Sequence, residues 1–275
     1  MSLFAIPFPA VDPVAIQLGP IALKWYGLAY MTGLLGGWTY IKHMLADQRL
    51  WGGRAAPFAP EKVDDLLLYM VLGVVLGGRL GEVLFYELGY FIKNPAQILA
   101  IWKGGMSFHG GLVGAIVAIT WFAWRNGTDL RSAFDLCAAV TPIGIFFGRL
   151  TNFVNVELWG RVTDVPWAFV FPHPEAGPLP RHASQLYEAA LEGAALFLVL
   201  RWLTHTRLML TRPGMVAGIF MAGYAIARSL CEPFRDQDWG HPLAVGWLTP
   251  GIVYSLPMLA IGVYLWLTAR DRQPA

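Results

Sequence analysis

Long apolar segments recur along this chain of 275 residues, and they restrict its fold more than any other feature. A helix needs about 20 mostly apolar residues to cross the hydrocarbon core of a bilayer. Inside lipid the backbone has no water to bond, so such a segment must be helical. The sequence therefore predicts an all-α, polytopic integral membrane protein with about seven transmembrane helices. The predicted spans are residues 21–41, 64–88, 109–124, 133–150, 185–203, 214–231 and 247–268.

The composition favours the same class of protein. Only 14% of the residues are charged, whereas soluble globular proteins average roughly 25%. The chain has 12 Trp, 10 Tyr and 30 Gly, residue types that are common in membrane proteins. A net charge of +2 is too small to indicate nucleic-acid binding. Cys137 and Cys231 lie in apolar stretches and are interpreted as buried small residues rather than a disulfide or a nucleophile.

Basic residues are concentrated in alternate loops, which predicts the orientation of the chain. By the positive-inside rule, the N-terminus is periplasmic and the C-terminus is cytoplasmic. Residues 151–184 then form the longest periplasmic loop, and 92–107 form a re-entrant or interfacial helix. The residues behind this bias are Lys42, Arg49, Arg54, Lys62, Arg125, Arg131, Arg201, Arg207, Arg212, Arg270 and Arg272.

Glycines recur four residues apart in several of the predicted spans. Small residues at this spacing let two helix backbones approach closely, so close packing is the expected role. The pattern contains Gly33, Gly37, Gly73, Gly77, Gly81, Gly110, Gly114, Gly144 and Gly148.

Three arginines, Arg79, Arg149 and Arg228, lie within or at the ends of apolar segments. A guanidinium does not lose its proton in a protein. Each must therefore meet a buried carboxylate, a water-filled cavity or a bound anion, which makes it a functional-site hypothesis. Binding of anionic lipid headgroups is one such function.

The segment GRLTNFVNVELWGR, residues 148–161, places Arg149 beside Asn152, Asn155 and Glu157. Arginine forks bind phosphate oxygens in pairs. Asparagine amides can donate to, or accept from, phosphate and ester groups. Glu157 is expected to orient an arginine. The alternative is an interfacial cluster that reaches toward water.

His109, in KGGMSFHGGL, is expected near the N-terminal end of the third span. A helix N-terminus disfavours the imidazolium, and a neutral imidazole can accept a proton. The alternative is an interfacial histidine that bonds to a carbonyl.

Two later segments add carboxylates. RHASQLYEAALEG carries Glu188 and Glu192 one turn apart, and YAIARSLCEPFRDQD carries Arg228 and Glu232 four residues apart. The latter two share a helix face and can pair, and Tyr224 lies one turn before Arg228. Buried carboxylates need cationic partners, and the three intramembrane arginines are available. A purely structural ion pair is the alternative. No metal-ligand spacing and no nucleophile elbow occur in the sequence.

These segments, in this order and with the early KWYGLAY, resemble the bacterial prolipoprotein diacylglyceryl transferase family over nearly the whole chain. Two positions depart from the family pattern. Thr151 stands where a Gly or Ala is usual, and Val156 stands where Gly is common. Both add bulk beside Asn152 and Asn155.

The resemblance implies a single transmembrane catalytic domain, residues 1–275, in the bacterial inner membrane with its site toward the periplasm. It would transfer the diacylglyceryl group of phosphatidylglycerol to the lipobox cysteine of a prolipoprotein, form a thioether and release glycerol phosphate, without a metal or cofactor. His109 would be the base, and Arg149 and Arg228 would hold the phosphate. In a variant, the arginines dominate and His109 only positions groups.

Further residues are expected to contact substrate: Tyr26, Arg79, Asn152, Asn155, Glu157, Gly160, His182, Glu188, Tyr224 and Glu232. Two other functions stay open. A lipid or anion transporter or flippase would also place arginines mid-membrane, but it favours internal repeats, and none is found. A non-catalytic lipid-binding scaffold gives no reason for His109.

Overall fold

A computed structural model describes residues 5–9, 11–12, 14–236 and 248–271. The beginning of the last predicted span at residue 247, and the basic Arg272, lie outside the described residues. The chain divides into two compact units. The first is formed within residues 1–40 and 135–275, and the second is Ile41–Phe134.

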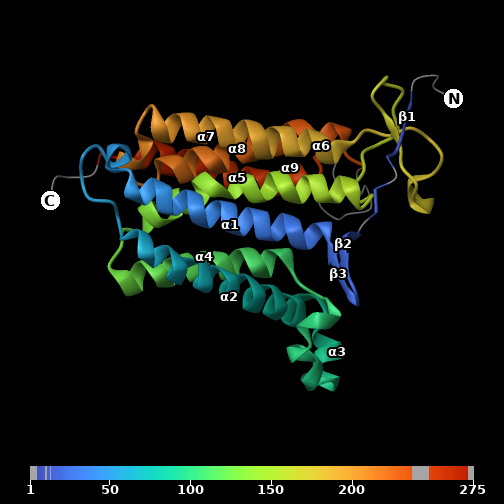
Figure 1. The fold of residues 1–275 in the computed structure, drawn as a ribbon, viewed down its shortest axis with the longest axis horizontal. Coiled ribbons are helices and arrows are strands. Elements are labelled where there is room, and N and C mark those ends of the chain that lie inside the picture. The colour runs from blue at the N-terminus through green and yellow to red at the C-terminus, as the bar shows by residue number, and fades with distance from the viewer. Residues whose placement is uncertain (1–4, 10, 13, 237–247, 272–275) are drawn as a thin grey trace. The chain divides into compact units, whose positions relative to one another are not determined.

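A helix occupies most of each predicted span, but residues 21–24 of the first span form a strand (Figure 1). By length and composition, and among the described residues, four helical stretches can cross a membrane: Pro60–Tyr86, Leu130–Val154, Met215–Phe234 and Pro250–Thr268. The protein is thus mostly helical, as predicted, while the number of spans stays a prediction. The helices at the predicted spans are α1 (Trp25–Ala46), α2 (Val63–Gly81), α4 (Phe108–Asn126), α5 (Leu130–Val154), α6 (Ser184–Glu188) continuing through the π-helical turn η7 (Ala189–Ala195) into α7 (Leu196–His205), α8 (Met215–Cys231) and α9 (Pro250–Thr268).

Two small sheets depart from the all-α prediction. Strands β2 (Val14–Leu18) and β3 (Ile21–Lys24) form an antiparallel hairpin, and β1 (Ile6–Pro7) pairs in parallel with β4 (Phe169–Val170). The hairpin turns at Gly19, whose φ of 58° is easily adopted only by glycine. The strands have two to five residues, too few to produce a readable alternation of polar and apolar positions.

Short helical pieces complete the chain. In the predicted re-entrant region 92–107, the structure has two 3-10 turns that follow the short helix α3 (Leu88–Lys93) rather than one continuous helix. A π-helical turn, η3 (Glu82–Tyr86), extends α2. The 3-10 turns of the described residues are Gln48–Trp51, Pro60–Lys62, Pro95–Leu99, Ile101–Lys103, Pro174–Ala176, Met209–Thr211 and Glu232–Phe234.

In the second unit, α2 and α4 pack through facing glycines. A Cβ added to Gly114 would lie 1.9 Å from the carbonyl oxygen of Gly73, and one added to Gly77 would lie 2.4 Å from that of Gly110. The expected close packing is confirmed for this pair of helices. Ser107 caps α4 by accepting a hydrogen bond from the Gly110 amide at 3.1 Å. The first turn of α4 is therefore fixed against α2.

In the first unit, glycines let neighbouring helices approach one another closely. A Cβ on Gly193 of η7 would lie 2.7 Å from Phe146 Cβ on α5. A Cβ on Gly218 of α8 would lie 2.7 Å from the carbonyl oxygen of Gly262 on α9. The buried Asp135 of α5 caps α8, because its carboxylate accepts the amides of Gly214 and Ala217, each at 2.7 Å.

Residues 155–183, predicted as a surface loop, form a packed cap on the first unit. Phe171, Ala176 and Ala183 make a small core that aromatic side chains such as Phe153 and Trp159 cover. The cap is also tied to the chain that follows α8, because the backbone of Gly160 pairs with that of Arg235. The predicted loop was residues 151–184, and it began one turn too early because residues 151–154 belong to α5.

Candidate active site

Three arginines and three glutamates form one group of ion pairs in the first unit, here called the charge cluster. They come from α5, from the continuous helix α6–η7, and from the end of α8 with the turn after it. Burial requires the carboxylates to be paired. The members are Arg149, Glu188, Glu192, Arg228, Glu232 and Arg235.

Arg149 forms ion pairs with two carboxylates on successive turns of one helix. Its Nη1 lies 3.2 Å from Glu188 Oε2, and its Nη2 lies 3.2 Å from Glu192 Oε2. Both glutamate side chains are fully buried, whereas 19% of the Arg149 side chain is exposed. Two buried carboxylates therefore hold a side chain that is itself partly exposed.

Glu188 joins Arg149 to the arginines of the other segment. Its Oε1 lies 3.6 Å from Arg228 Nη1 and also contacts Arg235. Arg228 pairs with Glu232, as its spacing of four residues predicts. Glu232 in turn lies 3.8 Å from Arg235 Nε. The two arginines predicted to hold a phosphate thus meet at a single carboxylate.

Arg235 was not among the predicted site residues. It lies beyond the predicted span 214–231 and after the end of α8, and its backbone pairs with that of Gly160. Its spacing of three residues from Glu232 was the available signal. Tyr224, one turn before Arg228 on α8, lies close enough to Arg149 and Glu192 to interact with their charges.

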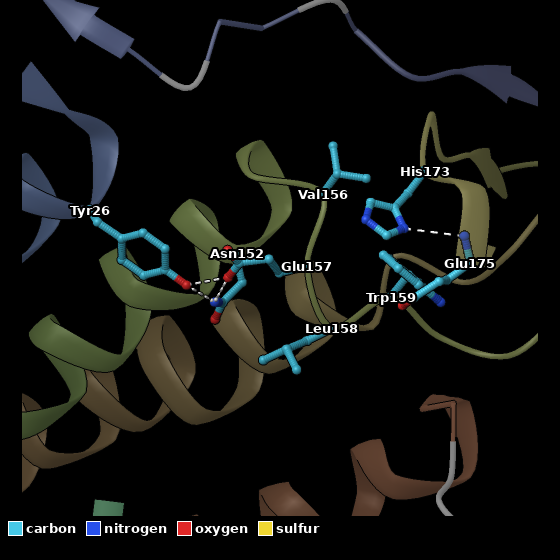
Figure 2. A pocket seen from close by; sticks show the side chains of 8 residues that line it. All are labelled: Tyr26, Asn152, Val156, Glu157, Leu158, Trp159, His173 and Glu175. Atoms are coloured by element: carbon cyan, nitrogen blue, oxygen red, sulfur yellow. Dashed lines mark hydrogen bonds between the residues drawn. The ribbon is translucent and has the colours of Figure 1, made fainter. Parts of the chain in front are cut away.

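A second polar group lines an open pocket of about 410 Å³ in the first unit. In Figure 2, Tyr26 of α1 points toward Asn152 of α5 and Glu157. The Tyr26 hydroxyl donates to Glu157. The Asn152 amide donates to the Tyr26 oxygen at 2.6 Å and to Glu157 Oε2 at 3.2 Å. Among the described residues, the Glu157 side chain therefore holds these two groups and not the arginine that was expected. The other lining residues are Val156, Leu158, Trp159, His173 and Glu175.

Three more predicted site residues lie where the cap begins and ends. Asn155 Oδ1 is buried with no hydrogen-bond partner among the described residues, so it can accept a bond from a ligand. Gly160 has no room for a side chain, since its Cβ would lie 2.3 Å from the carbonyl oxygen of Phe234. His182 is buried, and its Nδ1 lies 3.1 Å from the Tyr187 hydroxyl. Burial, together with the charge of Arg161, lowers the pKa of His182, which is therefore neutral at pH 7.

The remaining predicted residues, Arg79 and His109, belong to the second unit. Arg79 donates to the carbonyls of Ile98, Gly104 and Gly105 at 2.8–2.9 Å. The guanidinium was expected to meet a carboxylate, a cavity or an anion. Instead it satisfies the carbonyls of the irregular backbone between α3 and α4, which a regular helix would have satisfied itself. His109 is exposed in the first turn of α4, close to its predicted place at the beginning of a span, with its ring edge-on to Phe108 at 5.6 Å.

Comparisons with known proteins agree with the family resemblance found in the sequence. The family model described as prolipoprotein diacylglyceryl transferase matches residues 13–268. A relative from Rhizobium meliloti (strain 1021) is 52% identical over 272 residues, which cover 98% of this chain and 95% of the relative. One from Phenylobacterium zucineum (strain HLK1) is 50% identical over 280 residues, which cover 98% and 96%. Both relatives carry the name phosphatidylglycerol–prolipoprotein diacylglyceryl transferase. The chain belongs to the prolipoprotein diacylglyceryl transferase family.

Proposed function

We propose that this chain transfers the diacylglyceryl group of phosphatidylglycerol to the lipobox cysteine of a prolipoprotein. The products are a thioether and glycerol phosphate. Close relatives carry this activity in their names. The observation that carries the proposal in the structure is the meeting of Arg149 and Arg228 at Glu188.

The reaction develops negative charge on a phosphate group, and the arginines of the charge cluster can stabilise it. The sulfur attacks the diacylglycerol carbon and breaks its C–O bond to phosphate. The single negative charge of the phosphodiester then grows toward the two charges of a phosphate monoester. Arginines fixed in advance stabilise such a charge strongly where little water is present. Arg149 and Arg228 are our candidates for this role, since buried carboxylates hold both.

The pocket beside Tyr26 suits the neutral part of the lipid head. The hydroxyl groups of the headgroup glycerol need both donors and acceptors, and Tyr26, Asn152 and Glu157 supply them. Asn155 offers a further acceptor in its unpartnered oxygen. Tyr224 and Glu232 would position the arginines. Gly160 and His182 would maintain the shape of the cap.

A thiol with a pKa near 8.5 is mostly protonated at neutral pH, so a base must take its proton. His109 is our candidate for this base, on the strength of its place at a helix N-terminus. If the arginines alone activate the reaction, replacing His109 will leave turnover almost unchanged.

The proposed topology places about seven helices in the inner membrane, with the cap of residues 155–183 on the periplasmic side. It is supported by the alternation of basic loops and by the helices at all of the predicted spans.

A direct assay tests the function. Purified protein is incubated with phosphatidylglycerol and a lipobox peptide, and the mass of the peptide is followed. The expected result is a diacylglyceryl adduct on cysteine. An absent adduct, where the Rhizobium meliloti relative reacts in parallel, would contradict the proposal and would favour a transporter or a lipid-binding scaffold.

Variants test the residues. Arg149→Ala and Arg228→Ala should each slow transfer by about 100-fold or more, because a donor that stabilises charge in the transition state is lost. Arg149→Lys keeps the positive charge beside the glutamates but loses the fork, and it should also be slow. Arg207→Ala is the matched control, since Arg207 is an exposed arginine over Trp202. His109→Gln with normal turnover would remove His109 as the base.

A further inference from the structure

The charge cluster is electrically balanced. Three guanidiniums carry three positive charges, and three carboxylates carry three negative charges. The carboxylates are almost fully buried, with exposed side-chain fractions of 0%, 0% and 6% for Glu188, Glu192 and Glu232. The cluster is therefore not the net positive site that its arginines alone predict.

This balance has a consequence for binding of an anion. A phosphodiester brings one negative charge, and its arrival would leave the buried cluster with a net charge of minus one. An uncompensated charge in a buried site is strongly unfavourable. The charge is compensated if one of the glutamates takes up a proton when the phosphate binds.

The three glutamates differ in how well their negative charge is supported. Glu188 is paired with three arginines and Glu232 with two. Among the described residues, Glu192 forms an ion pair with Arg149 alone, through Oε2. Its Oε1 is buried and has neither a hydrogen bond nor an ion pair among the described residues. Glu192 thus depends on Arg149, one of the two arginines proposed to hold the phosphate.

The other groups near Glu192 give little further support. Glu188 lies on its own helix and repels it. Arg228, Tyr224 and Cys231 face it from α8, but Arg228 is already paired with Glu188 and Glu232. Arg149 is the residue of α5 whose charge acts on Glu192. When a phosphate engages Arg149, Glu192 loses the ion pair that the described part of the chain gives it.

We propose that Glu192 binds a proton when an anionic lipid headgroup engages Arg149, and releases it when the glycerol phosphate product leaves. This inference rests on the proposed function, in which the charge cluster holds the phosphate. The proton comes from the solvent and returns to it, so the transfer reaction gains or loses none overall. Before binding, ionised Glu192 positions Arg149. After binding, the neutral acid no longer competes with the phosphate for the guanidinium.

Proton uptake makes affinity depend on pH. A ligand whose binding takes up one proton binds up to about tenfold more weakly for each unit rise in pH, while free Glu192 is ionised and bound Glu192 is protonated. With Glu192→Gln the side chain is already neutral, so affinity should be nearly independent of pH over the same range.

Titration calorimetry with dihexanoyl phosphatidylglycerol, a lipid short enough to stay monomeric, tests this on the intact protein. The binding heat is measured at one pH in two buffers with different ionisation enthalpies, and the difference gives the number of protons bound. The wild-type protein should take up about one proton per lipid. Glu192→Gln should bind the lipid and take up none. Glu61→Gln, at an exposed glutamate of the second unit, is the control and should behave as wild type.

The outcomes separate this inference from the proposed function. Lipid binding by the wild-type protein without proton uptake would overturn the role of Glu192 and leave the phosphate site intact. If lipid binding does not depend on Arg149, the phosphate site itself is overturned instead. Because the wild-type measurement decides the first question alone, the test stands even if Glu192→Gln does not fold.

Discussion

Val156 adopts a left-handed backbone conformation, with a φ of 56°. This conformation costs an ordinary residue about 1–2 kcal/mol, and it is least suited to β-branched side chains. The position lies directly after the second asparagine of the site motif, where glycine is common in the family pattern. The departure therefore leaves the turn in place but strains it. Thr151, the other departure, is accommodated because its hydroxyl donates to the Phe147 carbonyl at 2.9 Å.

Two variants separate the strain at Val156 from the packing of its side chain. Val156→Ala removes most of the side chain and keeps the strain, whereas Val156→Gly removes both. The Val156→Gly variant should therefore have a free energy of unfolding about 1 kcal/mol higher than that of Val156→Ala, because only glycine adopts a positive φ without cost. Thermal unfolding in detergent measures the difference. A glycine variant less stable than the alanine variant would contradict the strain.

His182 should make the fold sensitive to acid. Its pKa is lowered in the folded chain by burial and by Arg161, so below about pH 6.5 the unfolded chain binds a proton that the folded chain resists. The stability that His182 provides is complete above pH 6.5 and is lost as the pH falls toward the folded pKa. His182→Gln should lose less stability than wild type between pH 7.5 and 5.5. Equal losses in thermal unfolding midpoint for the two proteins would disprove the effect.

The partners of single residues were predictable where burial of a charge by itself demands a partner. Arg149, Arg228 and Glu188 had to find partners of opposite charge, because a charge in an apolar segment must be compensated. The identity of the third arginine was not predictable, since Arg235 joins only because the chain after α8 pairs with the cap. Arg79 illustrates the converse: backbone carbonyls, which no sequence pattern displays, satisfy its guanidinium.

At the scale of elements, the contact between the cap and the end of α8 depends on one glycine. A Cβ on Gly160 would lie 2.3 Å from the Phe234 carbonyl oxygen and 2.7 Å from His182 Cβ. Neither neighbour is the far end of a flexible side chain. The cap can therefore accept a larger residue only by moving away from the segment that carries Arg235.

Gly160→Ala should lower the free energy of unfolding by roughly 3 kcal/mol or more, the upper range for overpacking. It should also reduce transferase activity, because Arg235 and Glu232 follow the displaced backbone. Gly148→Ala is the matched control from the same motif, since nothing lies within 4 Å of its added Cβ. Thermal unfolding and the peptide assay measure both effects. A Gly160→Ala protein as stable as the control would show that the contact yields easily.

Helices were predictable because length and apolarity in a membrane leave the backbone no other choice. Their interruptions were not. The π-helical turn η7 carries Glu192 and packs Gly193 against α5, but apart from this glycine its residues are ordinary helix formers. Likewise, the strands and the cap are specified by pairing with distant residues, such as Ile6 with Phe169, which periodicity within a short window does not contain.

At the scale of the whole molecule, the orientation in the membrane rests on charge alone. Lys and Arg residues are concentrated in alternate loops, which the positive-inside rule places in the cytoplasm. The cap of residues 155–183 belongs to a loop that the same rule places in the periplasm. The catalytic proposal depends on the same orientation, since Arg235 of the charge cluster pairs with the backbone of Gly160 in this cap.

Reporter fusions test the orientation. Alkaline phosphatase is active only after export, and green fluorescent protein fluoresces only when it folds in the cytoplasm. Phosphatase inserted after Pro178, an exposed position of the cap, should be active. The same insertion after Asn126, between α4 and α5, should be inactive, because Arg125 and Arg131 hold that loop inside. A green fluorescent protein fused after Ala275 should fluoresce. The reverse pattern would place the cap in the cytoplasm, where it could not receive an exported prolipoprotein.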